Sequence, residues 1–167
     1  MQRQLGMNWL SVMTAMLFMM TGCAQDENFD QMFQRLTDGD VTVVKPAEAM
    51  ELTKALFLDA REPREYEVSH IEGARCIGYD EFDLDSISDL DKSQPIVVYC
   101  SVGYRSEKIG EKLQDAGFTN VYNLYGGIFH WINTDHPVVS NTGQTNAVHA
   151  FNKKWGKWLE KGDKVYE

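Results

Sequence analysis

One cysteine of the chain, Cys100, stands where a protein places a nucleophile. It ends the apolar run 95–100, and a polar loop with one glycine follows over residues 101–106. The thiolate is the reactive form of cysteine, and free backbone N–H groups at a loop or helix N-terminus favour its negative charge. Arg105 adds a fixed positive charge to the same loop. These residues predict nucleophilic sulfur chemistry at Cys100.

The flanking residues predict the elements that hold this loop. The run 95–100 is continuously apolar, which is typical of a strand buried on both faces of a parallel sheet. Ile109 and Leu113 follow at helical spacing, and Gly117 is a natural helix end. A strand, a loop and a helix in this order place Cys100 at the carboxyl end of a strand, where open α/β sheets bind ligands.

Three further blocks accompany the cysteine loop, in a fixed order. The four blocks are LDAREPREY at 58–66, HIEGA at 70–74, CSVGYRS at 100–106 and LYGGIFHW at 124–131. Together they resemble the rhodanese-like (sulfurtransferase) domain family over residues 56–137. The resemblance implies an α/β fold with a five-stranded parallel sheet and helices on both faces.

The resemblance also implies a reaction. Cys100 would accept a sulfane sulfur from thiosulfate or another persulfide and pass it to a thiol or a cyanide-like acceptor. The loop that would hold the persulfide consists of Ser101, Val102, Gly103, Tyr104, Arg105 and Ser106. Val102 stands where familiar thiosulfate enzymes often carry a basic residue, which questions thiosulfate as the physiological donor. Tyr104 enlarges the loop rim, so a larger thiol, a protein persulfide or a protein acceptor stays open.

Loop length argues against phosphatase chemistry. Cysteine phosphatases use C-x5-R to wrap a phosphate, whereas Cys100 and Arg105 form the shorter C-x4-R. A tighter ring with fewer N–H donors suits a single terminal sulfur better than a tetrahedral oxyanion.

Other motif residues have structural interpretations. We expect Asp59 and Arg61 to form an ion pair that ties neighbouring loops together, with Glu65 as a further supporting residue. Gly126 and Gly127 are expected to provide positive φ or a close backbone approach near the loop. The histidines lack metal-ligand spacing, and neither a metal nor an organic cofactor is implied.

Cys76 has two interpretations. It lies in a short expected strand, and it could resolve a persulfide or sulfenate on Cys100, or pair with it in an oxidising compartment. The favoured alternative is a small hydrophobic core residue, because a disulfide requires Cα atoms within about 7 Å.

The N-terminus predicts export. Residues 1–22 contain one basic residue, Arg3, then an apolar stretch that is short for a membrane span. Small residues precede Cys23 and resemble a bacterial lipobox, so Cys23 is interpreted as the lipid-bearing first residue of a mature, membrane-anchored lipoprotein. Ala24 follows it, which favours the periplasmic face of the outer membrane over the inner one. An uncleaved anchor or an ordinary secretory signal is the alternative.

Composition bounds the partners and the organisation. The formal net charge of −9 disfavours a nucleic-acid partner. Beyond the signal peptide we expect an acidic tether at 23–40 with a short amphipathic helix, then a single domain at 41–139. Residues 140–167 are expected to form a polar linker and an amphipathic helix over 151–164 that packs on the domain, with membrane contact as the alternative. Strands are expected at 41–44, 55–58, 76–78, 96–99 and 121–124.

The sequence thus predicts an exported sulfurtransferase that cycles Cys100 between thiol and persulfide. The alternative is a non-enzymatic periplasmic module that binds a persulfide or undergoes thiol redox chemistry through Cys100, with or without Cys76.

Overall fold

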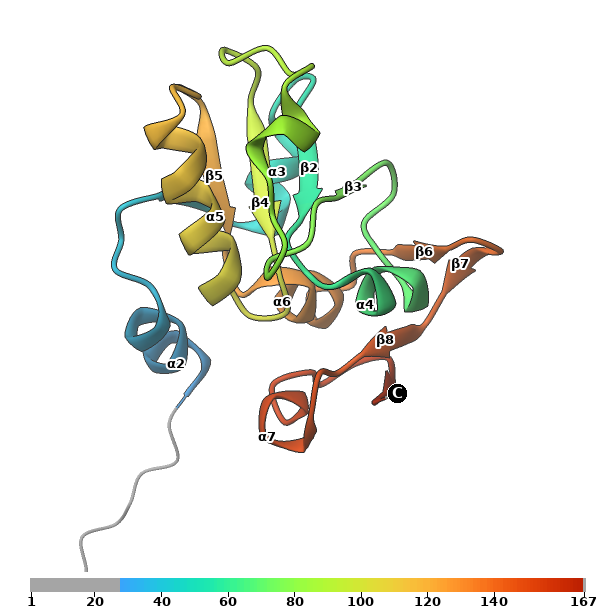
Figure 1. Ribbon diagram of the computed structural model, residues 1–167. Coiled ribbons are helices and arrows are strands. Elements are labelled where there is room, and N and C mark those ends of the chain that lie inside the picture. The colour runs from blue at the N-terminus through green and yellow to red at the C-terminus, as the bar shows by residue number, and fades with distance from the viewer. Residues whose placement is uncertain (1–27, 167) are drawn as a thin grey trace, which may run out of the picture.

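The computed structural model describes residues 28–166, and Cys23 with its preceding signal pattern lies outside them. A parallel sheet of order β1-β5-β4-β2-β3 forms the centre of the molecule (Figure 1). Its strands are β1 (Thr42–Val44), β2 (Leu56–Asp59), β3 (Arg75–Cys76), β4 (Ile96–Tyr99) and β5 (Val121–Leu124). The five-stranded parallel sheet predicted from the sequence is confirmed, with strand bounds shifted by a residue or two.

Helices surround this sheet, and some of them cover its two faces. They are α2 (Phe29–Leu36), α3 (Pro46–Glu51), α4 (Pro63–Val68), α5 (Tyr104–Asp115), α6 (Gly127–Asn133) and α7 (Lys153–Gly156), with a 3-10 turn at Leu84–Ile87. The central strand β4 is fully buried. Its Ile96 and Val98 pack with Ile109 of α5, while Val97 and Tyr99 belong to a second cluster with α3 and α6. This two-sided burial explains why β4 reads as a continuous apolar run.

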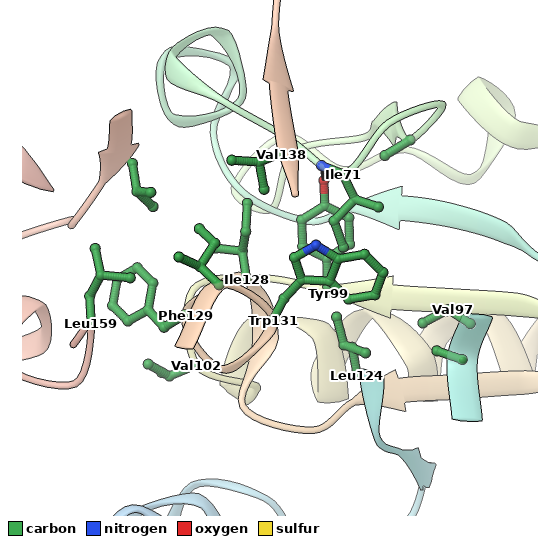
Figure 2. Packing of buried hydrophobic residues seen from close by; sticks show 14 of the residues in the cluster. Ile71, Val97, Tyr99, Val102, Leu124, Ile128, Phe129, Trp131, Val138 and Leu159 are labelled. Carbon is green, nitrogen blue, oxygen red and sulfur yellow. Dashed lines mark hydrogen bonds between the residues drawn. The ribbon is translucent and has the colours of Figure 1, made fainter. Parts of the chain in front are cut away.

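The second cluster draws residues from distant parts of the chain. Figure 2 shows Tyr99 and Leu124 of the sheet together with Phe129 and Trp131 of α6, and Leu159 from the C-terminal segment. The core on this face therefore extends beyond the sheet and its helices.

The acidic N-terminal segment contains the predicted amphipathic helix, α2. Asn28 and Gln31 form a reciprocal capping box at its start, which satisfies two of the free N–H groups there. Met32 is 0% exposed and Phe33 5%, so α2 is packed into the domain.

The C-terminal prediction of a helix over residues 151–164 is wrong. Only α7 is helical there, and β9 (Asp163–Val165) returns to pair in parallel with β8 (Ala147–His149). The expected polar linker instead contains the hairpin of β6 (Val138–Ser140) and β7 (Gly143–Thr145). The aromatic spacing is helical, but strand pairing with β8 outweighs that local preference. Packing of this segment on the domain is confirmed, because Leu159 is completely buried.

No helix among residues 28–166 is long and apolar enough to cross a membrane.

Candidate active site

Cys100 directly follows β4 and lines a cavity. It is 1% exposed, and the N–H of Gly103 points to its Sγ at 3.2 Å. Helix α5 begins at Tyr104, so its free N–H groups and the positive end of its dipole lie beside the sulfur. The strand, loop and helix predicted from the sequence are therefore present, and they bring an N–H donor to the thiol.

Glycine is required at the turn of the loop. Gly103 has φ 115°, a left-handed conformation that side chains disfavour. A Cβ there would also lie 2.4 Å from the ring of Phe33 on α2. The N-terminal helix thus packs directly against the cysteine loop.

A buried polar network fixes the start of α5. The Asn123 amide donates to Gly103 O at 3.0 Å and to Glu107 Oε2 at 2.8 Å, and its oxygen accepts from Ser106 Oγ at 2.7 Å. Ser106 Oγ is also 3.6 Å from Cys100 Sγ. Both Asn123 and Glu107 are fully buried. Neither residue belongs to the four motif blocks, so neither was predicted as a site residue.

Arg105 forms an ion pair inside the site. Its guanidinium donates to both carboxylate oxygens of Glu65 at 2.7 and 2.9 Å, and to Ser101 Oγ at 3.0 Å. Burial raises the pKa of Glu65, but the hydrogen bonds and charge of Arg105 outweigh it and leave that pKa below its ordinary value. The planar pair joins α4 to the cysteine loop and leaves Arg105 largely neutralised.

Asp59 and Arg61 form the expected ion pair, deep below the cavity. Arg61 Nη2 is 2.6 Å from Asp59 Oδ2 and 2.7 Å from the Ser69 carbonyl, with both charged side chains 0% exposed. Burial opposes the charge of Arg61, but Asp59 outweighs it and raises the pKa of the guanidinium. Arg61 does not line the cavity. The pair holds the end of β2 to the turn after α4.

Cys76 and Cys100 are both free thiols. Cys76 pairs with Asp59 on β2, and Asp59 pairs with Tyr99 on β4, so one strand separates the two cysteines. Strands lie about 4.8 Å apart, which puts Cys76 about 10 Å from the end of β4, beyond the roughly 7 Å limit for a disulfide. Burial, followed by the charge of Asp59, raises the pKa of the Cys76 thiol. The separation argues against a disulfide with Cys100, but Cys76 is only half-buried and does not belong to the hydrophobic core predicted for it.

The double glycine lets α6 approach the cysteine loop. Gly126 and Gly127 have φ values of 65° and 57°, as expected. A Cβ on Gly127 would lie 2.2 Å from the carbonyl oxygen of Cys100, and the N–H of Ile128 donates to that oxygen at 2.8 Å. The backbone of α6 thereby holds the residue that bears the nucleophile.

A cavity of ≈ 560 Å³ opens above Cys100. Its lining consists of Leu36, Glu62, Arg64, Tyr79, Asp80, Cys100, Ser101, Val102, Tyr104, Arg105, Phe151 and Trp155. The cavity brings together most of the predicted loop. It adds residues from both ends of the chain that the sequence analysis did not connect with the site.

The sequence model of the family described as the rhodanese-like domain matches residues 25–134. This protein belongs to the rhodanese-like domain family. Solved rhodanese-like structures agree. The rhodanese-related protein of Thermoplasma volcanium has a TM-score of 0.54 at 29% identity, covering 59% of this chain and 97% of that one. The rhodanese-like domain of an Anabaena sp. protein has a TM-score of 0.54 at 25% identity, covering 59% of this chain and 78% of that one.

Curated relatives share the same region. The tRNA uridine(34) hydroxylase of Hamiltonella defensa is 38% identical over 99 residues, which are 54% of this chain and 28% of that protein. An uncharacterized Bacillus subtilis protein, YqhL, is 36% identical over 78 residues, 47% of this chain and 61% of that protein. The chain therefore spans about a quarter of the hydroxylase and less than two thirds of YqhL.

The match to the rhodanese-like domain ends at residue 134, before the hairpin of β6 and β7. We call residues 138–166 the C-terminal tail. Figure 1 shows the tail, in orange and red, folded beneath the carboxyl ends of the strands, where it contributes Phe151 and Trp155 to the cavity. Both residues lie outside the four motif blocks, and their sequence predicted packing on the domain but not a place at the site.

Proposed function

We propose that this protein is a sulfurtransferase that carries a sulfane sulfur as a persulfide on Cys100. One observation carries the proposal: Cys100 lines a cavity, with its Sγ 3.2 Å from the Gly103 nitrogen and beside the N-terminus of α5. This arrangement places a nucleophilic sulfur beside donors that stabilise anionic sulfur before and after transfer. Membership of the rhodanese-like family supports the same chemistry.

The reaction has two balanced halves. The Cys100 thiolate attacks the outer sulfur of a donor R–S–SH, the sulfur–sulfur bond of the donor breaks, and its electron pair leaves with R–S⁻. Cys100–S–SH then gives the outer sulfur to an acceptor thiolate, which becomes the new persulfide as the Cys100 thiolate returns. Thiosulfate as donor leaves as sulfite, and cyanide as acceptor becomes thiocyanate. Neither half requires an external oxidant or reductant.

The loop residues divide into two roles. Backbone N–H groups of residues 101–106 would hold the outer sulfur, as the Gly103 N–H already faces Sγ. Arg105 lines the cavity but is held by Glu65, so we assign it chiefly to positioning the loop. Glu65 in turn accepts from Ser101 Oγ at 3.2 Å, which ties both ends of the loop to one carboxylate.

Intact-protein mass spectrometry tests this function. The purified protein would be mixed with thiosulfate or a small-molecule persulfide and then with cyanide. We expect a gain of one sulfur atom that cyanide removes, abolished in Cys100→Ser and retained in Cys76→Ser and Cys23→Ser. If no donor adds sulfur, the proposal is wrong. A loss of two hydrogens that requires both Cys76 and Cys100 would instead favour the non-enzymatic redox module.

Nucleic acid is not part of the proposed substrate, although hydroxylases named for tRNA share this region. The chain covers only about a quarter of those proteins, and its net charge is −9. The cavity wall carries Glu62 and Asp80 as well as Arg64 and Arg105, so it offers no continuous basic surface for phosphates.

We further propose that the protein is exported and anchored through a lipid on Cys23, at the periplasmic face of the outer membrane. The support is the lipobox-like sequence before Cys23 and the Ala24 that follows it. Metabolic labelling with palmitate should mark the wild type and leave Cys23→Ala unlabelled and released from the membrane fraction. Labelling that persists in Cys23→Ala would contradict this anchor.

A further inference from the structure

The cavity above Cys100 is larger than the sulfur chemistry alone requires. Its volume of ≈ 560 Å³ lies within the roughly 300–1,000 Å³ range of sites that bind drug-sized organic molecules. A small inorganic anion such as thiosulfate cannot fill it. Residues outside the cysteine loop line the additional space.

Two aromatic rings of the C-terminal tail form part of that wall. Phe151 and Trp155 line the cavity together with Tyr104 and Tyr79, which gives the wall several flat apolar surfaces. The guanidinium of Arg105 lies 5.3 Å from the centre of the Phe151 ring, a cation–π contact that fixes the ring next to the cysteine loop. The tail thus reaches the residues that hold the reacting sulfur.

The backbone at Phe151 is held in an unfavourable conformation. Phe151 has φ 61°, a left-handed value that is rare for a bulky residue, yet its side chain remains 38% exposed. The Phe151 N–H donates to His149 Nδ1 at 3.2 Å, and Asn152 accepts from Trp155 N at 3.1 Å to start α7. Strained backbone of this kind concentrates at functional sites, where the surrounding structure enforces it. Burial of the Phe151 ring in the core does not account for the strain.

The charges around the cavity favour a substrate of mixed character. Glu62 and Asp80 face it as well as Arg64 and Arg105, and Arg105 is already neutralised by Glu65. An inorganic dianion gains little from such a wall. An organic molecule with apolar surface, and with both charges or none, is complementary to it.

We propose that Phe151 and Trp155 form a binding subsite for the organic part of a small thiol or its persulfide, so that the tail determines which carbon-bearing substrate reacts at Cys100. This inference rests on the proposed function and deepens it. The subsite binds R of the donor R–S–SH or of the acceptor R–SH, while the cysteine loop handles the transferred sulfur.

Single-turnover transfer from persulfidated protein tests the subsite. Cys100 would be loaded with a small-molecule persulfide or with thiosulfate, the excess donor removed, and decay of the protein persulfide followed with benzyl mercaptan, 2-mercaptoethanol and cyanide. In the wild type we expect the second-order rate constant for benzyl mercaptan to exceed that for 2-mercaptoethanol by at least tenfold. Phe151→Ala and Trp155→Ala should lower the ratio of the benzyl mercaptan rate to the cyanide rate at least fivefold.

Tyr166→Ala is the matched control, because Tyr166 is an exposed aromatic residue of the same tail that does not line the cavity. Its rate ratio should equal that of the wild type. Equal losses with all three acceptors in Phe151→Ala and Trp155→Ala would assign these residues a structural role and overturn the proposal. An unchanged ratio would overturn it as well.

A binding measurement separates this inference from the proposed function. In Cys100→Ser, where no transfer takes place, benzyl mercaptan should shift the indole N–H resonance of Trp155, assigned by its absence in Trp155→Phe. Phe151→Ala in the same background should weaken this binding at least fivefold. If Cys100→Ser binds benzyl mercaptan but the wild type never forms a persulfide, sulfur transfer is contradicted and the subsite is retained. If the wild type transfers sulfur but Cys100→Ser does not bind benzyl mercaptan, only the subsite is contradicted.

Discussion

At the scale of single residues, the site depends on a few buried charges. Glu65 is one of them: it accepts two hydrogen bonds from Arg105, one from Ser101 and one from the Glu62 N–H, with its side chain 0% exposed. A carboxylate in this position is stable only while its partners are present. The loop that carries the nucleophile is therefore coupled to α4 through one ion pair.

Replacing Glu65 should destabilise the fold in a pH-dependent way. Glu65→Gln leaves the Arg105 charge without its partner, which costs about 3–5 kcal/mol of unfolding free energy for a buried pair. Because the pKa of Glu65 is lowered by folding, its contribution is complete above its ordinary value of 4.5 and is lost as pH falls through the folded value. Urea unfolding from pH 7 to pH 3 should show the wild type converging on Glu65→Gln below pH 4.5.

The exposed Glu67 of the same helix provides the control for this experiment. Glu67→Gln should follow the wild-type stability curve at every pH. A difference between wild type and Glu65→Gln that stays constant down to pH 3 would show that the charge of Glu65 does not stabilise the site.

Replacing Asn123 with a charged residue should strongly destabilise the protein. Asn123→Asp removes the amide that donates to Glu107 and places two fully buried carboxylates against each other, where the amide N now lies 2.8 Å from Glu107 Oε2. We expect a loss of about 3–5 kcal/mol at pH 7, measured by chemical denaturation. The exposed Asn141, mutated to Asp, should stay within about 0.5 kcal/mol of wild type. Equal stability of the two variants would refute the network as drawn.

At the scale of elements, the turn into α6 positions the cysteine loop. Gly127→Ala should cost about 4 kcal/mol and displace Cys100, because the new Cβ meets the Cys100 carbonyl at 2.2 Å and backbone cannot yield cheaply. Gly143 is the control for backbone strain without a steric clash, because it has φ 112° and nothing lies within 4 Å of an added Cβ. Gly143→Ala should cost only the conformational penalty of about 1–2 kcal/mol. Thermal unfolding would measure the loss of stability in both variants. Equal losses in Gly127→Ala and Gly143→Ala would contradict this account.

The sequence was informative for elements whose local pattern agrees with their environment. The run before Cys100 predicts a strand correctly because β4 is buried on both faces, and Gly126 and Gly127 mark a close approach because only glycine permits it. The tail is the opposite case. Its aromatic residues have helical spacing, yet β9 pairs with β8 in a register that joins Ala147 to Asp163, and local periodicity does not encode this pairing.

The residues that line the cavity were likewise predicted only in part from the sequence. The sequence motifs identified Cys100 and its loop, because the chemistry and the loop sit in one contiguous segment. Phe151 and Trp155 reach the site only through the folding of the tail, and Leu36 through the packing of α2. Such residues become visible as site residues only when the tertiary structure brings them to the loop.

At the scale of the whole molecule, both ends of the described chain converge on the active site. The ring of Phe29 on α2 meets Trp158 of the tail edge to face, with ring centres 5.7 Å apart. Leu36 lines the cavity from one side, and Phe151 and Trp155 line it from the tail. Figure 1 shows α2 and α7 at the same end of the sheet, where its strands have their carboxyl ends. The rhodanese-like core is thus completed by its terminal segments.

If the tail is part of that single core, a mutation in it must destabilise the entire domain. Leu159 is 0% exposed and shares a cluster with Phe129 and Trp131, so Leu159→Ala should cost about 2–5 kcal/mol through lost burial and the cavity it leaves. Urea unfolding followed by tryptophan fluorescence and by far-UV circular dichroism should shift to one lower midpoint shared by both signals. Leu84→Ala, at a 41% exposed position, should leave the midpoint unchanged. Separate transitions, or a wild-type midpoint in Leu159→Ala, would mean that the tail folds apart from the core. It would then be too loosely held to keep Phe151 over Arg105.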